Sequence, residues 1–244
     1  MDCTLLRRAT AETVGSAFLV AIVVGSGIFA QRLSPHDLGL QLFENSTATG
    51  AGLVGLILAF GPVSGAHLNP VVSLADRILG GLSTAETVAY SLAQILGACA
   101  GAVIANLMFD LSAVNVSTHV RSSGGLWLGE VVATFGLLTV ILGIVRSGRS
   151  TVAPFAIGGY IAAAYWFTSS TSFANPAVTI GRTLTDTFAG IKPSSAPAFI
   201  VAQVIGGLAA VGLALFLHPT LNAGDLVVPH ELTDPDPSGA NPDV

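Results

Sequence analysis

Two short stretches constrain the fold of this chain more than any other feature: residues 66–73 (AHLNPVVS) and residues 173–179 (FANPAVT). In each, an Asn (Asn69 or Asn175) stands directly before a Pro. Asn is a favoured helix cap because its side-chain oxygen accepts a backbone N–H of the first turn. Pro suits the first helical position, where its missing N–H costs nothing and its φ is already helical. Each stretch therefore predicts the start of a helix.

The helix that begins at Asn69 is too short to cross a bilayer. It ends near Leu79, so its about 11 residues reach only ~16 Å, half of a ~30 Å hydrocarbon core. The second helix fades near Asp186. The comparison with a bilayer is justified by the composition: 52% of the residues are hydrophobic and 9% are charged, whereas a soluble domain carries roughly 25% charged residues. The composition thus indicates an integral membrane protein with two half-length helices.

Composition also argues against other classes of protein. The nine basic residues form no basic patch, and much of the net charge of −5 comes from acidic residues near the C-terminus, so no nucleic-acid partner is expected. The chain shows no cluster of His, Asp and Glu with metal-ligand spacing and no glycine-rich phosphate loop. We therefore expect no metal, no cofactor and no enzymatic activity.

Long apolar runs predict six membrane spans, and small residues or Pro mark their ends. Arg7 and Arg8 before the first span, and the turn that carries Arg146 and Arg149, favour a plasma (inner) membrane protein with both termini in the cytoplasm. The predicted order is a cytoplasmic N-terminus (1–8), a channel domain (9–217) and a disordered acidic, proline-rich tail (218–244). The spans are 9–29, 48–63, 85–108, 126–145, 152–168 and 196–217, with external loops at 31–46 and 110–125.

The two halves of the channel domain, 9–110 and 126–217, share one pattern: span, span, half-helix, span. Glu12 opens the first half and Glu130 the second, and the segment AQILG in the third span matches AQVIG in the sixth. Three spans per half make the second half lie upside down, and such inverted repeats build their shared site at the midplane from broken helices. We expect an all-α fold of six transmembrane helices and two re-entrant half-helices.

In that arrangement the two half-helices enter from opposite faces and meet at their N-termini. Each Asn caps its own helix through its oxygen and points its NH2 group into the lumen. Both N-termini carry partial positive charge, roughly half a unit at the aligned limit. The centre would repel cations and protons and offer hydrogen bonds to a neutral solute, so the chain is expected to be a pore.

The Asn-Pro pair, the 3+3 spans, the two glutamates and the Gln-x-x-Gly segments closely resemble the aquaporin, or major intrinsic protein, family. The resemblance covers about residues 9–217. It implies a homotetramer in the bilayer with one pore per subunit and passive flow of water or small uncharged solutes. The central pore residues it implies are Asn69, Pro70, Val71, Asn175, Pro176 and Ala177.

Two departures from the family pattern bear on the solute. Val71 stands where the family usually has Ala, which adds bulk beside the asparagines, and Val178 stands where it normally has Arg. By the family's spacing the outer selectivity filter consists of Thr49, Ala163, Ser172 and Val178, with Tyr165 as the alternative to Ala163. A filter without the Arg is expected to be wider and less polar, because pore diameter and lining groups set selectivity.

The amino-acid sequences of the two Asn-Pro motifs are similar to those of bacterial aquaglyceroporins associated with arsenic resistance. That resemblance implies a channel for glycerol-type polyols and metalloid hydroxides such as arsenite, together with water. Two alternatives remain: a water-selective aquaporin, and a secondary transporter with the same inverted repeat. A transporter needs a coupling-ion site, for which the spans offer only Glu12 and Glu130.

Three polar residues near the predicted pore allow two interpretations each. Glu12 and Glu130 are expected to bind free backbone N–H groups of the re-entrant loops, with proton coupling as the alternative. His67 lines the cytoplasmic vestibule or packs against a loop carbonyl.

Overall fold

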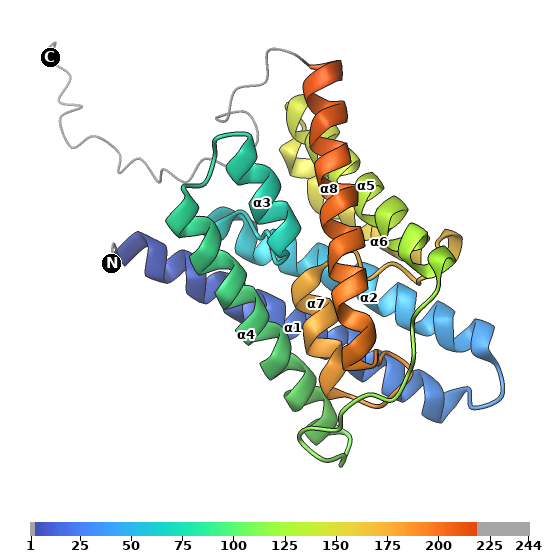
Figure 1. Cartoon of the computed structure of the whole chain (residues 1–244). Helices are drawn as coiled ribbons and strands as arrows, with labels where there is room; N and C mark the ends of the chain where they lie inside the picture. Colours follow the sequence, from blue (N-terminus) through green and yellow to red (C-terminus); the bar gives the residue numbers. More distant parts are fainter. Residues whose placement is uncertain (1–2, 219–244) are drawn as a thin grey trace, which may run out of the picture.

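The computed structural model describes residues 3–218, and within that range it contains helices and connecting loops but no strand (Figure 1). The predicted disordered tail therefore lies outside the described residues, apart from His218. The long helices are α1 (Cys3–Leu33), α2 (Leu38–Ser64), α4 (Thr84–Met108), α5 (Gly124–Arg146), α6 (Ala153–Phe167) and α8 (Ala196–Leu217). Between them lie the short helices α3 (Pro70–Ile78) and α7 (Pro176–Gly181) and the 3-10 turns η1 (Ser150–Val152), η2 (Arg182–Leu184) and η3 (Pro193–Ser195).

Five of the described helices, α1, α2, α4, α5 and α8, are long and apolar enough to cross a membrane. The sixth, α6, has 15 residues, and the η1 turn precedes it directly. Large apolar side chains such as Leu96, Phe155 and Phe216 are exposed on the outside of the bundle, as expected where lipid replaces water. The predicted fold class, six transmembrane helices with two re-entrant half-helices, is confirmed.

The inverted repeat is visible in how the long helices cross. In the first half α1 packs along α4 and α2, and in the second half α5 packs along α8 and α6 (Figure 1). Gly97 of α4 lies against the carbonyl of Thr13, and Gly206 of α8 lies against the carbonyl of Val131, so that a Cβ at either glycine would overlap backbone. Small residues permit such close crossings of helices in a bilayer.

The first predicted external loop, residues 31–46, is too long, because the connection between α1 and α2 covers only residues 34–37. α1 continues to Leu33 and α2 begins at Leu38, with Asp37 capping it through a bond from the Leu40 amide (2.8 Å). Several of the polar residues that suggested a loop are instead buried, among them Gln41, Asn45 and Ser46 of α2. Asn45 donates through Nδ2 to the carbonyl of Val23 (2.9 Å), for example. The polar side chain of Asn45, near the start of α2, therefore forms hydrogen bonds between α2 and α1.

Candidate functional site

A cavity of about 590 Å³ lies between the two halves of the bundle. We call the end of the bundle where α1 begins the inner end, and the opposite end the outer end. The cavity extends from Arg146 and Ser150 near the inner end to Thr49 and Tyr165 near the outer end, and Asn69 and Asn175 both line its middle. Figure 1 shows that α3 lies toward the inner end and α7 toward the outer end, so the half-helices approach the cavity from opposite sides.

The two asparagines cap their own half-helices as predicted from the Asn-Pro motifs. Oδ1 of Asn69 accepts the amide of Val71 (3.0 Å), and Oδ1 of Asn175 accepts the amides of Ala177 (2.9 Å) and Val178 (3.2 Å). The prolines occupy the first helical position in both cases.

Each asparagine also bonds to the opposite half, which the sequence analysis did not foresee. Nδ2 of Asn69 donates to the carbonyl of Ala174, and Nδ2 of Asn175 donates to the carbonyl of Leu68, both at 2.7 Å. The prediction that the whole NH2 group points into the lumen was therefore incomplete. One N–H of each amide joins the two tips, and only the second N–H remains for a solute.

The loops that lead into the asparagines share an unusual backbone. The third and first residues before each Asn have positive φ: Ala66 (46°) and Leu68 (50°) in one loop, Ser172 (50°) and Ala174 (49°) in the other. Left-handed conformations at non-glycine residues cost of order 1–3 kcal/mol each and persist only where surrounding contacts hold them. The same pair of strained positions in both loops indicates that strong contacts fix the loops.

Glu12 and Glu130 supply those contacts, in line with the expectation for them. Glu12 accepts the backbone amides of His67 (2.9 Å) and Leu68 (2.6 Å). Glu130 accepts the amides of Phe173 and Ala174 (both 2.9 Å). Each glutamate is 0% exposed, so each re-entrant loop is anchored to the first helix of its own half.

A glutamine on the last helix of each half completes the anchor. Nε2 of Gln94 donates to Glu12 (2.7 Å) and to Ser73 (3.0 Å). In the second half, Nε2 of Gln203 donates to Glu130 (2.6 Å) and to Thr179 (2.9 Å). In the sequence these glutamines indicate the repeat, but their bonding role appears only in the structure. Their signal was the Gln-x-x-Gly match at equivalent positions of the two halves.

Four of the proposed filter residues line the outer part of the cavity: Thr49, Tyr165, Ser172 and Val178. All four are buried, and the hydroxyls of Thr49 and Tyr165 lie 3.3 Å apart. Ala163, the first choice on the fifth span, is exposed on the outside of α6 and does not line the cavity. The fifth-span assignment to Ala163 is therefore wrong, because the helical register turns Tyr165 inward instead.

Val71 also differs from its expectation. Its side chain is 2% exposed and does not line the cavity. It packs against α8, where its Cγ1 occupies the space that a Cβ on Gly207 would need. The extra bulk of Val71 is thus accommodated between α3 and α8 and does not narrow the centre. Pro70, Pro176 and Ala177 support the tips from behind and do not line the cavity either.

His67 lies where its first interpretation places it, and its side chain contacts a hydroxyl and an aromatic ring. It lines the inner part of the cavity, its Nδ1 lies 3.1 Å from Oγ of Ser73, and its ring packs edge-on against Tyr90 with centroids 5.3 Å apart. Within residues 3–218, no group of three or more His, Cys, Asp or Glu side chains could hold a metal ion.

Arg182 was not among the pore residues predicted from the sequence. Arg182, one turn after Val178, is only 2% exposed and lines the cavity. The signal that could have found it is the spacing, because residues four apart share a helix face.

Comparison with known proteins agrees with this architecture. The family model described as "Major intrinsic protein" matches residues 1–174. The chain is 49% identical over 213 residues to "Aquaglyceroporin AqpS" of Rhizobium meliloti (87% of this chain, 91% of that protein). It is 27% identical over 245 residues to "Probable aquaporin AqpM" of Archaeoglobus fulgidus (89% and 99%).

Among solved structures, the X-ray structure of the aquaglyceroporin from Plasmodium falciparum superposes with a TM-score of 0.69. It is 20% identical and the match covers 89% of this chain and 98% of that one, so this likeness concerns the fold. Fold, anchored half-helices and the family match lead to one conclusion. The chain belongs to the major intrinsic protein family and is a multi-pass membrane channel, not an enzyme.

Proposed function

We propose that the chain conducts glycerol-type polyols and metalloid hydroxides such as arsenite, with water, passively through one pore per subunit. The observation that carries this proposal is the outer wall of the cavity. Val178 is apolar where the family usually has Arg, and Thr49, Ser172 and Tyr165 offer hydroxyls to the same stretch. A wall of hydroxyl and apolar groups suits solutes that carry both carbon and hydroxyl surface.

The relatives support the choice of solute. The protein at 49% identity is named an aquaglyceroporin. Because the match covers 91% of that protein, a glycerol-conducting pore is the first expectation here. Arsenite rests on the resemblance of the motifs to channels associated with arsenic resistance. As(OH)3 is neutral and presents hydroxyl groups in the manner of a small polyol.

The secondary-transporter alternative loses its only candidate groups. Each of the two intramembrane glutamates uses both carboxylate oxygens to accept backbone and side-chain hydrogen bonds. A coupling-ion site needs ligands free to bind and release the ion. Glu12 and Glu130 act instead as fixed supports of the loops.

We also propose a homotetramer in the plasma (inner) membrane with both termini in the cytoplasm. Exposed apolar side chains on α8, such as Val201 and Ile205, support burial against lipid or a neighbouring subunit. Arg146 and Arg149 at the inner end favour the cytoplasm for that end, by the positive-inside rule. Native mass spectrometry of the detergent-solubilised protein tests the subunit number, and four is expected.

Stopped-flow light scattering of proteoliposomes tests the solute. Vesicles are exposed to water, glycerol and arsenite gradients, with empty vesicles as the control. We expect all three solutes to cross faster than in empty vesicles, without saturation and without dependence on an ion gradient. Water flux without glycerol flux would make the chain a water-selective aquaporin, and saturable, ion-coupled flux would make it a transporter.

A further inference from the structure

Arg182 is a buried cation on the wall of the cavity. It begins η2, four residues after Val178, or ~6 Å farther toward the outer end at 1.5 Å per residue. Among the described residues that line the outer part of the cavity, Arg182 is the one with a basic side chain, whereas Thr49, Tyr165 and Ser172 contribute hydroxyl groups. The outer wall of the passage thus has an apolar side chain at Val178 and a positive group one turn beyond it.

The guanidinium is held in a fixed place. Nε donates to the carbonyl of Ala189, and the group lies over the ring of Phe173, 3.4 Å from its centroid, as in a cation–π contact. No carboxylate among residues 3–218 lies within ion-pair distance of it, and its terminal nitrogens make no hydrogen bond to that part of the chain. Within the described residues, its charge is therefore compensated by the Ala189 carbonyl and the Phe173 ring, and not by a carboxylate at ion-pair distance.

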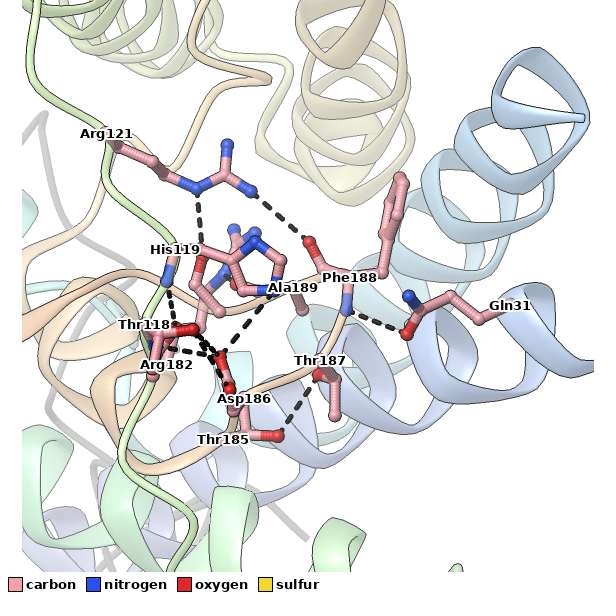
Figure 2. A network of polar contacts seen from close by, with 12 residues as sticks. Gln31, Thr118, His119, Arg121, Arg182, Thr185, Asp186, Thr187, Phe188 and Ala189 are labelled. Atoms are coloured by element: carbon pink, nitrogen blue, oxygen red, sulfur yellow. Dashed lines mark hydrogen bonds and ion pairs between the residues drawn. The ribbon is translucent and has the colours of Figure 1, made fainter. Parts of the chain in front are cut away.

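A second arginine, Arg121, bonds to the same segment of backbone, residues 188–190. Arg121 donates through Nε to the carbonyl of Gly190 (2.9 Å) and through Nη2 to that of Phe188 (3.3 Å). Three consecutive carbonyls, at Phe188, Ala189 and Gly190, thus accept bonds from two arginines, and Figure 2 shows how Arg121 and Arg182 converge on this segment. Arg121 does not line the cavity. The two arginines therefore bond to the same segment, but only Arg182 reaches the pore.

A fixed charge on the wall of a passage bounded by protein acts on ions far more than on neutral molecules, because Coulomb energy grows as the effective dielectric constant falls. We propose that Arg182 is the residue that excludes protons and other cations at the outer end of the pore, while neutral solutes pass along Val178. This inference rests on the proposed function. It assigns to the displaced arginine a selectivity role that the apolar side chain of Val178 cannot perform.

The test compares Arg182→Gln with the wild type in proteoliposomes. Glycerol flux is measured by light scattering, and proton leak by an internal pH dye under a potassium diffusion potential. Gln keeps a polar side chain but removes the charge. We expect the ratio of proton leak to glycerol flux, both measured in the same vesicles, to rise about tenfold or more over the wild type. Glycerol flux above that of empty vesicles shows that the variant is folded.

Arg121→Gln is the matched control, since it removes a cation that bonds to the same segment, residues 188–190, but does not line the cavity. Its proton leak should equal that of the wild type. Equal leak in Arg182→Gln and the wild type, or the same rise in both variants, would overturn the inference. Absence of glycerol flux in the wild type would instead contradict the proposed function, so the two failures are distinguishable.

If Arg182→Gln yields no folded protein, Arg182→Lys gives the answer, because it keeps the charge and loses only the planar fork. We expect its leak to stay within about threefold of the wild type. A leak in Arg182→Lys as high as in vesicles with an added proton ionophore, with glycerol flux retained, would overturn the inference.

Discussion

The contact between α3 and α8 provides a sharp test of how the inner half-helix is seated. Val71 fills the space that a Cβ on Gly207 would occupy. In the other half of the repeat the volume is divided differently, with Ala177 in the place of Val71 and Ala98 in the place of Gly207 when the two Gln-x-x-Gly segments are aligned. The first contact thus combines a valine with a glycine, and its counterpart in the repeat combines two alanines at the equivalent positions.

The expected energies follow from this exchange. Gly207→Ala forces a methyl group against Val71, and overpacking of this kind costs about 1–3 kcal/mol. Val71→Ala leaves a void and costs about 1–2 kcal/mol. The double variant Val71→Ala/Gly207→Ala recreates the pairing of the other half, so we expect stability within ~1 kcal/mol of the wild type and a coupling energy of about 3 kcal/mol.

Thermal unfolding in detergent micelles, followed by tryptophan fluorescence, measures these differences. At ~2–4 °C per kcal/mol for a chain of this size, Gly207→Ala should lower the midpoint by about 4–8 °C, and the added Val71→Ala should restore most of that loss. Gly212→Ala on the same helix is the control, because a Cβ there meets no atom within 4 Å. Additive losses in the double variant would refute the packing argument.

Three further predictions concern the pore and its outer loop. Val178→Arg should narrow the outer passage and reduce glycerol or arsenite flux more than water flux in the vesicle assay; equal loss for all solutes would show that this residue does not set the width. Asn69→Asp or Asn175→Asp should admit cations, because a fixed negative charge opposes the helix dipoles, and unchanged conductance in both would contradict central electrostatic exclusion. A hydrogen bond from the Thr118 amide holds the pKa of Asp186 below its ordinary value of 3.8. The ionised carboxylate therefore stabilises the folded loop above pH 3.8, and this stabilisation is lost as the pH falls below that value. Hydrogen exchange of the Thr118 amide, measured relative to its rate in the unfolded chain, should accelerate below pH 3.8. Asp186→Asn should not show this acceleration.

Much of the fold could be predicted because its signals are local. The Asn-Pro pairs mark both half-helices, since capping and the geometry of Pro depend on adjacent residues. The inverted repeat could be read from Glu12 and Glu130 at matching places before matching helices. The anchoring role of these glutamates followed from the need of any buried backbone amide for an acceptor.

The errors arose where a residue's role depends on the facing helix. Polar residues such as Asn45 suggested a loop, but they bond to α1 inside the membrane bundle. The choice between Ala163 and Tyr165 depends on the rotation of α6, and the direction of Val71 depends on a glycine more than a hundred residues later. Arg182 required the three-dimensional cavity, because its sequence neighbourhood resembles an ordinary helix end.

The central claim is that two half-helices from opposite sides meet tip to tip and are joined by their asparagines beside a water-filled passage. An electron cryo-microscopy or crystal structure in lipid, at a resolution that shows ordered water, tests it most directly. The account predicts density linking Asn69 to the Ala174 carbonyl and Asn175 to the Leu68 carbonyl, both at 2.7 Å, with a file of waters alongside. Separated tips, or a midplane packed dry with side chains, would contradict it.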